Sequence, residues 1–312
     1  MRYKVCNTFY EGRMIEMKRS VVISGVVIVV LVFGAALIWH AVVVEDRAGK
    51  LTVSFLNVGQ GDAIFIDAPS GRQVLIDGGR NRAVLRELSR VSRWYDRSID
   101  VVIATHPDLD HIGGLVDVLA RYRVSTIVHT SVRDEEGTDS EAFERAAKEE
   151  TEHGAKIITA ERGQIIDLGS GAYLEILSPD RDVPRVDTNM GCVVARLVYG
   201  ETAFMLSCDA PQAIENYLVR LDGSASLTTG GSGLKSNVLK AGHHGSRTSS
   251  SALFVGFVDP EYAVFSRGCD NTYGHPHQEV VDLFKRFEIP TLDTCTDGTV
   301  TFVSDGRTVR RR

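Results

Sequence analysis

The sequence predicts a mixed α and β domain (class α+β) behind a single apolar N-terminal segment. The 312 residues are 43% hydrophobic, which is enough for a sizeable core. From residue 51 onward, short runs rich in β-branched and aromatic residues alternate with amphipathic stretches of helical period. Before residue 45 stands one run of apolar residues without a formally charged side chain. These three observations define the expected organisation.

The apolar run, Val21–Val44, is long enough to cross a bilayer of about 30 Å at roughly 1.5 Å per residue. Basic residues precede it, whereas Glu45 follows it directly. The positive-inside rule therefore predicts a short cytoplasmic N-terminus at 1–20, a transmembrane anchor at 21–44 and an extracytoplasmic remainder. A cleaved signal peptide is the alternative, but this run exceeds the roughly 7–15 residues of a signal h-region. We therefore expect an uncleaved anchor.

Beyond the anchor, hydrophobic periodicity and turn residues set the expected elements in chain order. Strands are predicted at 51–57, 63–68, 73–76, 99–104, 126–129, 156–159, 164–168, 173–177, 193–199, 202–206, 238–240, 262–266, 291–293 and 299–304. Helices are predicted at 81–91, 115–122, 140–153 and 278–287, and a further helix begins at Pro211. The Gly/Ser/Thr-rich stretch 221–236 predicts a flexible loop or lid, and 305–312 a solvated basic tail.

The segment Thr105–Gly114 contains the residues best suited to bind metal ions. It follows a predicted buried strand and precedes a predicted helix, so we place it on a strand-to-helix loop. Four metal-capable side chains lie within six residues, with no apolar stripe to explain them: His106, Asp108, Asp110 and His111. They could converge on two nearby cations, although short His/Asp clusters also occur as solvated loops. The glycines at 113 and 114 would let backbone approach a ligand closely.

Other polar residues end predicted strands. Asp77 follows a predicted strand directly, and Asp209 lies between a strand end and the helix that begins at Pro211. A turn-capping or helix-capping role explains each carboxylate without any metal. Two adjacent histidines, His243 and His244, lie between glycines and resist a packing explanation. On sequence alone, His275 is explained as an ordinary loop residue and the loop 59–62 as a plain turn.

The five cysteines show no CxxC spacing, which argues against a zinc knuckle or a redox motif. We expect buried free thiols, with Cys192 and Cys208 near each other across a hairpin. The net charge of -6 gives no bulk positive field for nucleic acid, so a polyanion would have to be held locally.

The central segment resembles the HxHxDH signature of the metallo-β-lactamase superfamily, with Asp108 where the second His usually stands. Together with Phe55–Ala63 upstream and Ala241–Ser246 downstream, it is similar to the hydrolase domain of ComEC-type competence proteins over residues 51–304. The resemblance implies a four-layer αββα sandwich with ligands along one edge. One departure is visible, because 189–192 lacks the further His that the superfamily often has at that position; ComEC-type proteins share this absence.

The resemblance also implies the roles of the site residues. The metal ligands would be His106, Asp108, Asp110, His111, Asp209 and His243, with Asp209 bridging both ions. Asp77 would orient a ligating His through its other ring nitrogen. His244 and Ser246 would line the pocket for substrate oxygens. His275 would bind phosphate or protonate the leaving group. The loop 59–62 lies close to the active site in that family, so it is either a plain turn or a substrate contact.

The expected cofactors are two divalent ions, Mn²⁺ or Zn²⁺, and the oxygen-rich ligand set favours Mn²⁺. Ions about 3.5–4 Å apart would lower the pKa of a bridging water, and Asp110 would orient the resulting hydroxide. The primary hypothesis is a membrane-anchored, extracytoplasmic phosphodiesterase or nuclease acting on DNA, with any channel supplied by a separate protein. A small-molecule ester or lactam hydrolase, and an anchored DNA-binding or assembly module with weak metal occupancy, are the alternatives.

Overall fold

The computed structural model describes residues 19, 21–39, 49–132, 138–180, 187–229 and 233–312. The chain divides into two compact units, Met1–Ala48 and Gly49–Arg312. In the first unit, Val21–Trp39 is a helix with a mean hydropathy of 3.1, long and apolar enough to cross a membrane. The last part of the predicted anchor, 40–44, lies outside the described residues.

The first sheet of the second unit has eight strands in the order β15-β14-β1-β2-β3-β4-β5-β6. Their bounds are β1 Leu51–Phe55, β2 Ile64–Asp67, β3 Gln73–Ile76, β4 Ser98–Ala104, β5 Arg123–His129, β6 Lys156–Thr159, β14 Val300–Ser304 and β15 Val309–Arg311. Strands β3 to β6 run parallel to one another, so their carboxyl ends lie at one edge of this sheet.

The second sheet has seven strands in the order β13-β12-β11-β10-β9-β8-β7. Their bounds are β7 Ile165–Gly169, β8 Ala172–Ser178, β9 Val194–Tyr199, β10 Thr202–Leu206, β11 Val238–Lys240, β12 Tyr262–Phe265 and β13 Thr291–Asp293. Strands β10 to β13 are parallel, which again gathers carboxyl ends at one edge.

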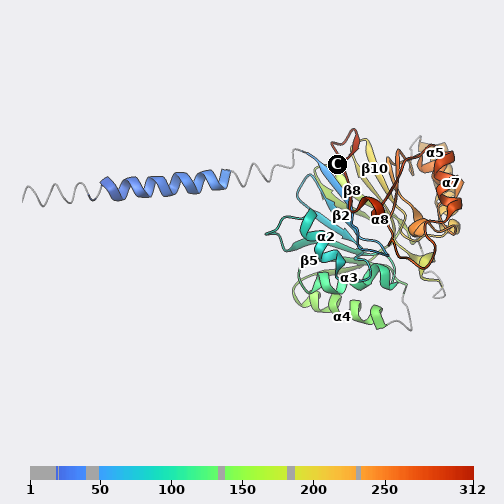
Figure 1. Ribbon diagram of the computed structural model, residues 1–312, viewed down its shortest axis with the longest axis horizontal. Helices are drawn as coiled ribbons and strands as arrows, with labels where there is room; N and C mark the ends of the chain where they lie inside the picture. Colours follow the sequence, from blue (N-terminus) through green and yellow to red (C-terminus); the bar gives the residue numbers. More distant parts are fainter. Residues whose placement is uncertain (1–18, 20, 40–48, 133–137, 181–186, 230–232) are drawn as a thin grey trace, which may run out of the picture. The chain divides into compact units, whose positions relative to one another are not determined.

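Helices cover the outer faces of both sheets. Their bounds are α2 Ala83–Val91, α3 Leu109–Leu119, α4 Thr138–Glu152, α5 Gln212–Thr229, α6 Ala252–Val258, α7 Gln278–Arg286 and α8 Thr294–Asp297, with 3₁₀ turns η1 Thr188–Gly191 and η2 Gly242–Gly245. Figure 1 shows α2, α3 and α4 on the side of the first sheet, and α5 and α7 on the side of the second. The predicted α+β class is confirmed.

The period of two along each strand explains the layers. On β3, Val74 and Ile76 pack into the core between the two sheets, whereas Leu75 packs outward under the helices of the first sheet. On β10, Phe204 packs inward, and Met205 packs outward under the helices of the second sheet. Each fully buried side chain of this size contributes about 1.5–3 kcal/mol. Burial on both faces therefore fixes the strand register that positions the loops at the strand ends.

The structure corrects three expectations of local structure. Helix α3 begins at Leu109, so Asp110 and His111 lie in its first turn and not on a loop. The weak helix propensity of Gly113 hides this start in the sequence. Helix α5 extends to Thr229, through residues expected to form a loop. The basic tail includes an edge strand, β15, because Val309 is buried against β14.

The cysteines also differ from the expectation. Cys192 and Cys208 are free and buried, as predicted. Cys269 and Cys295, expected to be free thiols, form a disulfide. Their separation of 26 residues belongs to no sequence motif. Only the adjacency of β12 and β13 brings them together, because Cys269 lies on the loop after β12 and Cys295 in α8, which follows β13.

Candidate metal centre

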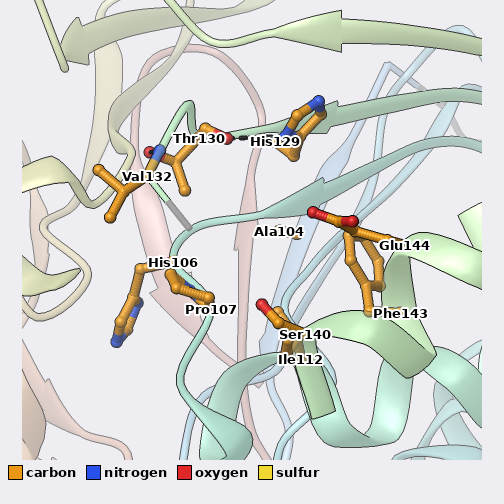
Figure 2. A pocket seen from close by; sticks show the side chains of 10 residues that line it. All are labelled: Ala104, His106, Pro107, Ile112, His129, Thr130, Val132, Ser140, Phe143 and Glu144. Carbon is orange, nitrogen blue, oxygen red and sulfur yellow. Dashed lines mark hydrogen bonds between the residues drawn. The ribbon is translucent and has the colours of Figure 1, made fainter. Parts of the chain in front are cut away.

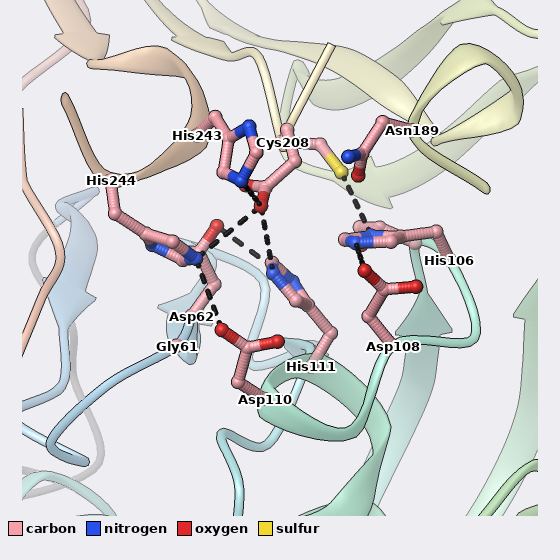
Figure 3. Close-up of polar contacts among 12 residues, drawn as sticks. Gly61, Asp62, His106, Asp108, Asp110, His111, Asn189, Cys208, His243 and His244 are labelled. Carbon is pink, nitrogen blue, oxygen red and sulfur yellow. Dashed lines mark hydrogen bonds and ion pairs between the residues drawn. The ribbon is translucent and has the colours of Figure 1, made fainter. Parts of the chain in front are cut away.

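A cluster of histidines and carboxylates lies where the carboxyl ends of parallel strands from both sheets meet (Figure 3). Asp77 follows β3, His106 follows β4, Asp209 follows β10, and the η2 turn with both adjacent histidines follows β11. Because strand ends are fixed by core packing on both faces, these side chains are held by rigid backbone. The predicted residues from both halves of the chain are therefore brought together.

The His111 ring is fully buried and oriented by Asp77. Its Nδ1 donates to Asp77 Oδ2 at 2.7 Å, and the same carboxylate accepts from the backbone and hydroxyl of Thr105. Its Nε2 lies 3.3 Å from Asp209 Oδ2 and makes no hydrogen bond. A carboxylate on one ring nitrogen presents the other nitrogen as a metal ligand. This contact is the one that the resemblance implies for Asp77.

His244 is held in the same manner from the opposite sheet. Its Nδ1 donates to the carbonyl oxygen of Ser266 at 2.8 Å. Its Nε2 lies 3.3 Å from Asp209 Oδ2 and 3.4 Å from Asp110 Oδ2, again without a hydrogen bond. Ligand atoms of Asp110, His111 and His244 all lie within 4.8 Å of one another. We name these three residues, with Asp209, the inner cluster.

His243, the residue expected to be the last ligand, lies nearer the surface. Its side chain is 29% exposed, and its Nε2 is 3.6 Å from Asp209 Oδ2. Its Nδ1 faces the Thr248 hydroxyl at 3.3 Å. Among the described residues, His243 belongs to none of the His, Cys and carboxylate groups that could hold an ion. The structure thus gives His244 the more enclosed position of the two.

His106 and Asp108 form a second, shallower group, which we name the outer cluster. His106 is fully buried, and its Nε2 lies 3.5 Å from Asp108 Oδ2, whose side chain is 40% exposed. The Nδ1 of His106 faces the hydroxyl of Thr105 at 3.1 Å and the thiol of Cys208 at 3.4 Å. The Nε2 has no hydrogen bond and is available to a cation.

Sequence reasoning missed a buried ion pair beneath the inner cluster. Lys240 is fully buried at the end of β11, and its Nζ lies 2.5 Å from Asp62 Oδ2 and 3.2 Å from Asp209 Oδ1. The lysine therefore occupies one oxygen of Asp209, while the other faces the histidines. A charged residue ending an apolar strand was the available signal, since such a residue is rarely buried unless paired.

The electrostatics of the inner cluster favour positive charge. Burial alone would lower the pKa of His111 and of His244, but the Asp209 carboxylate raises both well above the usual value. Burial would likewise raise the pKa of Asp209, yet His244, His111 and Lys240 hold it well below the ordinary range. Unpartnered ring nitrogens beside ionised carboxylates are a donor set that a divalent cation fits.

Glycines let three backbone segments meet at the cluster. A Cβ on Gly61 would lie 1.9 Å from the carbonyl oxygen of Asp110, and one on Gly114 would lie 2.1 Å from that of Gly78. Asp62 N donates to the same Asp110 carbonyl at 3.2 Å. The expectation that Gly113 and Gly114 admit a ligand is corrected, because they admit the loop after β3.

His275 and Ser246 lie at the rim. The His275 ring is 5.5 Å from that of His243, and its buried Nδ1 has no hydrogen-bond partner. Burial and the neighbouring histidines lower the pKa of His275 to about 4, so the ring is neutral at pH 7 and offers one N–H donor. Ser246 Oγ lies 3.0 Å from Thr248 Oγ1. The loop 59–62 reaches this region through Gly61, whose carbonyl accepts from Ser266.

A pocket opens behind the outer cluster (Figure 2). The pocket is small and partly open, with a cavity volume of about 30 Å³, and it lies between the β4 and β5 ends and α4. The lining residues are Ala104, His106, Pro107, Ile112, His129, Thr130, Val132, Ser140, Phe143 and Glu144. The Nδ1 of His129 donates to the carbonyl oxygen of Thr130, and the residue lines this pocket.

Two sheets between helical layers, with histidines and carboxylates at the strand ends, are typical of metal-dependent hydrolases. The sequence model of the Metallo-beta-lactamase superfamily matches residues 56–268, and the chain therefore belongs to this superfamily. Igni18, a metallo hydrolase from Ignicoccus hospitalis, has the same fold, with a TM-score of 0.52 at 16% identity over 80% of this chain and 98% of that one.

The resemblance to ComEC-type competence proteins is confirmed. ComE operon protein 3 of Bacillus subtilis is 29% identical over 80% of this chain and 32% of its own length. Recombination protein 2 of Haemophilus influenzae is 28% identical over 86% of this chain and 31% of its own. Competence protein ComA of Neisseria gonorrhoeae is 29% identical over 81% of this chain and 32% of its own length. The chain spans about a third of the length of these relatives.

Proposed function

We propose that this protein is a membrane-anchored, extracytoplasmic phosphodiesterase that cleaves DNA with two divalent metal ions. The observation that carries the proposal is the convergence of three unpartnered histidine Nε2 atoms, on His106, His111 and His244, around ionised carboxylates. Buried polar atoms without partners cost about 1–3 kcal/mol each, which a bound cation offsets.

The inner ion would be held by Asp110, His111, His244 and Asp209, and the outer ion by His106, Asp108 and Asp209. This set places His244 in the ligand position that the resemblance gives to His243, because the His244 ring is enclosed and its Nδ1 is already fixed by Ser266. His243, nearer the surface, would then face the substrate.

When bound, the two ions would supply an activated water near neutral pH and offset charge on a phosphoryl group. The protein's own residues do the positioning. Asp110, on the first turn of α3, would accept a hydrogen bond from the attacking water. His243, Ser246 and neutral His275 would donate hydrogen bonds to phosphodiester oxygens, and Asp77 would keep the His111 ring aligned.

Three aspartates supply oxygen ligands beside three histidines, which is a harder set than histidine alone. This composition favours Mn²⁺ as the working ion, with Zn²⁺ as the competitor of higher general affinity. DNA as the substrate is supported by the competence proteins among the relatives. Since the chain carries a net charge of -6, the ions themselves would provide the main attraction for phosphate.

The disulfide and the apolar helix support the proposed location. Disulfides persist in oxidising compartments outside the cytoplasm. Cys269–Cys295 ties the loop after β12 to the start of α8, next to the Arg267–Asp293 ion pair. Protease protection of the native chain in spheroplasts and in inverted vesicles would test the topology. Digestion of the hydrolase unit in inverted vesicles but not in intact spheroplasts would contradict the extracytoplasmic assignment.

The function is tested on the full chain in detergent, stripped of metal and assayed on single-stranded DNA with Mn²⁺ or Zn²⁺ added back. We expect metal-dependent cleavage that Asp209→Ala abolishes and that Asp117→Asn, a change at a partly exposed position of α3 that pairs with Arg82, leaves intact. Absence of cleavage in a folded protein that binds two ions would overturn the DNA substrate and direct attention to small esters.

Metal-binding and kinetic measurements distinguish the proposed roles of the two adjacent histidines, His243 and His244. His244→Ala should weaken the tighter Mn²⁺ site by at least about tenfold in calorimetry, as expected for loss of a ligand. His243→Ala should bind both ions normally and raise KM. The reverse pattern would restore His243 as the ligand and His244 as the substrate residue.

A further inference from the structure

The outer cluster has fewer protein ligands than the inner one. His106 and Asp108, with a share of Asp209, would leave an ion more exposed than the four residues of the inner cluster. The superfamily often supplies a further His here, and 189–192 has none. The 3₁₀ turn η1, Thr188–Gly191, lies at this point of the chain.

Hydrogen bonds tie η1 and its flanks to the motif segment. Thr188 Oγ1 donates to Asp108 Oδ1 at 2.7 Å. Just after the turn, Val193 N donates to the carbonyl oxygen of Thr105 at 3.0 Å. From the side of β5, Thr130 Oγ1 donates to the carbonyl oxygen of Gly191 at 2.7 Å. The turn is therefore held against the outer cluster at both of its ends.

Asn189 lies between these anchors. Its backbone N–H donates to Asp187 Oδ1 at 3.0 Å, which fixes the turn. Its side-chain Oδ1 is buried and has no hydrogen-bond partner. Figure 3 shows the amide in the same cluster as Cys208, His106 and Asp108. A buried amide oxygen without a donor costs about 1–3 kcal/mol, so a favourable partner for it is expected.

We propose that Asn189 Oδ1 is a ligand of the outer metal ion, in the place where the superfamily often has a His. This inference rests on the proposed function and assigns a further residue to the same site. The amide oxygen is uncharged and hard, so the outer ion would be held by two carboxylate oxygens, one amide oxygen and one imidazole. Such a set suits Mn²⁺ or Mg²⁺ better than Zn²⁺.

The test uses two near-isosteric variants of the full chain in detergent. Asn189→Leu removes the oxygen and keeps the volume, whereas Asn189→Asp keeps an oxygen in the same place. Mn²⁺ titration followed by calorimetry gives the number and affinity of sites, and electron paramagnetic resonance distinguishes a spin-coupled Mn²⁺ pair from a single ion. Neither readout requires turnover.

We expect Asn189→Leu to weaken the second, lower-affinity Mn²⁺ site by at least about tenfold, with loss of the coupled signal and an unchanged first site. Asn189→Asp should retain both ions. A third variant, Asn189→His, should shift the preference of the weaker site from Mn²⁺ towards Zn²⁺.

Two outcomes would overturn the inference. Equal binding of both ions by wild type and Asn189→Leu would exclude Asn189 as a ligand while leaving the hydrolase proposal intact. A wild-type protein that binds only one ion would have no outer site for Asn189 to complete. Absence of any metal binding in the folded wild type would instead be a failure of the proposed function.

Discussion

The inner and outer clusters differ in how the fold supports them. The inner cluster is backed by charged groups, because Asp77 accepts from His111 and Lys240 pairs with Asp62 and Asp209, all nearly or fully buried. The outer cluster is backed by neutral groups, since His106 faces a hydroxyl and a thiol, and Asp108 is 40% exposed.

From this difference we expect the two proposed metal positions to have separate roles. Buried carboxylates that fix the far nitrogen of a ligand raise both its basicity and its alignment. The inner position should therefore bind its ion tightly and retain it. The outer position, open on one side, should exchange its ion and admit the phosphodiester. The predictions below test this asymmetry.

The largest effect is expected from Asp209, the residue proposed to hold both ions. Asp209→Asn replaces with a neutral amide the carboxylate that faces His111, His244 and His243. DNA cleavage should fall by about 10³-fold or more, because a catalytic metal contributes several kcal/mol to the transition state. Single-turnover rates at saturating Mn²⁺ would measure this fall in the cleavage rate. Retention of a spin-coupled Mn²⁺ pair in this variant would argue against a bridging role.

The next effect concerns stability of the inner cluster. Lys240→Met leaves Asp62 buried without its cation, which should cost about 3–5 kcal/mol of unfolding free energy. The exposed pair Arg82–Asp117 serves as the control, and Arg82→Met should cost less than about 1 kcal/mol. Urea unfolding of the metal-free chain would compare them. Similar losses in both variants would mean that the buried pair has no special role.

A smaller effect is expected from the groups that contact the two proposed ligand histidines, His111 and His106. Asp77→Asn should weaken the tight Mn²⁺ site by about 10–100-fold, because the amide no longer supports His111 as a carboxylate does. Cys208→Ser behind His106 should change the weak site by less than about threefold, since burial raises the pKa of this thiol and keeps it neutral. Calorimetric titration would measure both. Equal effects would remove the distinction between the clusters.

The smallest effect is expected from Thr188, at the exposed side of the outer cluster. Thr188→Val removes the hydroxyl that donates to Asp108, and loss of one partly exposed hydrogen bond should cost about 0.5–1.5 kcal/mol. Affinity for the second ion should fall by less than about tenfold, with the first site unchanged. A change confined to the first site would show that Asp108 belongs to the inner ion.

Much of the fold was predictable, because strands that are buried on both faces of a sheet consist of runs of apolar residues. The bounds of β3, β6, β11 and β13 agree with the predicted strands. The start of α3 was not predictable, because Asp110, His111 and the two glycines that follow mask the helical period of its first turns. The extent of α5 was also missed, since helix propagation is cooperative and overrides the weak propensity of Gly, Ser and Thr.

The sequence by itself determined the class of site. Ligand-type side chains at strand ends, together with the superfamily signature around His106–His111, pointed to a metal centre without coordinates. Only the tertiary structure decided which residues converge. Asp62 and Lys240 are 178 positions apart and pair because the loop that carries Asp62 meets the end of β11 beneath the cluster. His244 faces inward because η2 turns it there. The direction of a side chain just after a strand depends on whether single residues there adopt left-handed backbone angles. Local sequence patterns do not encode this.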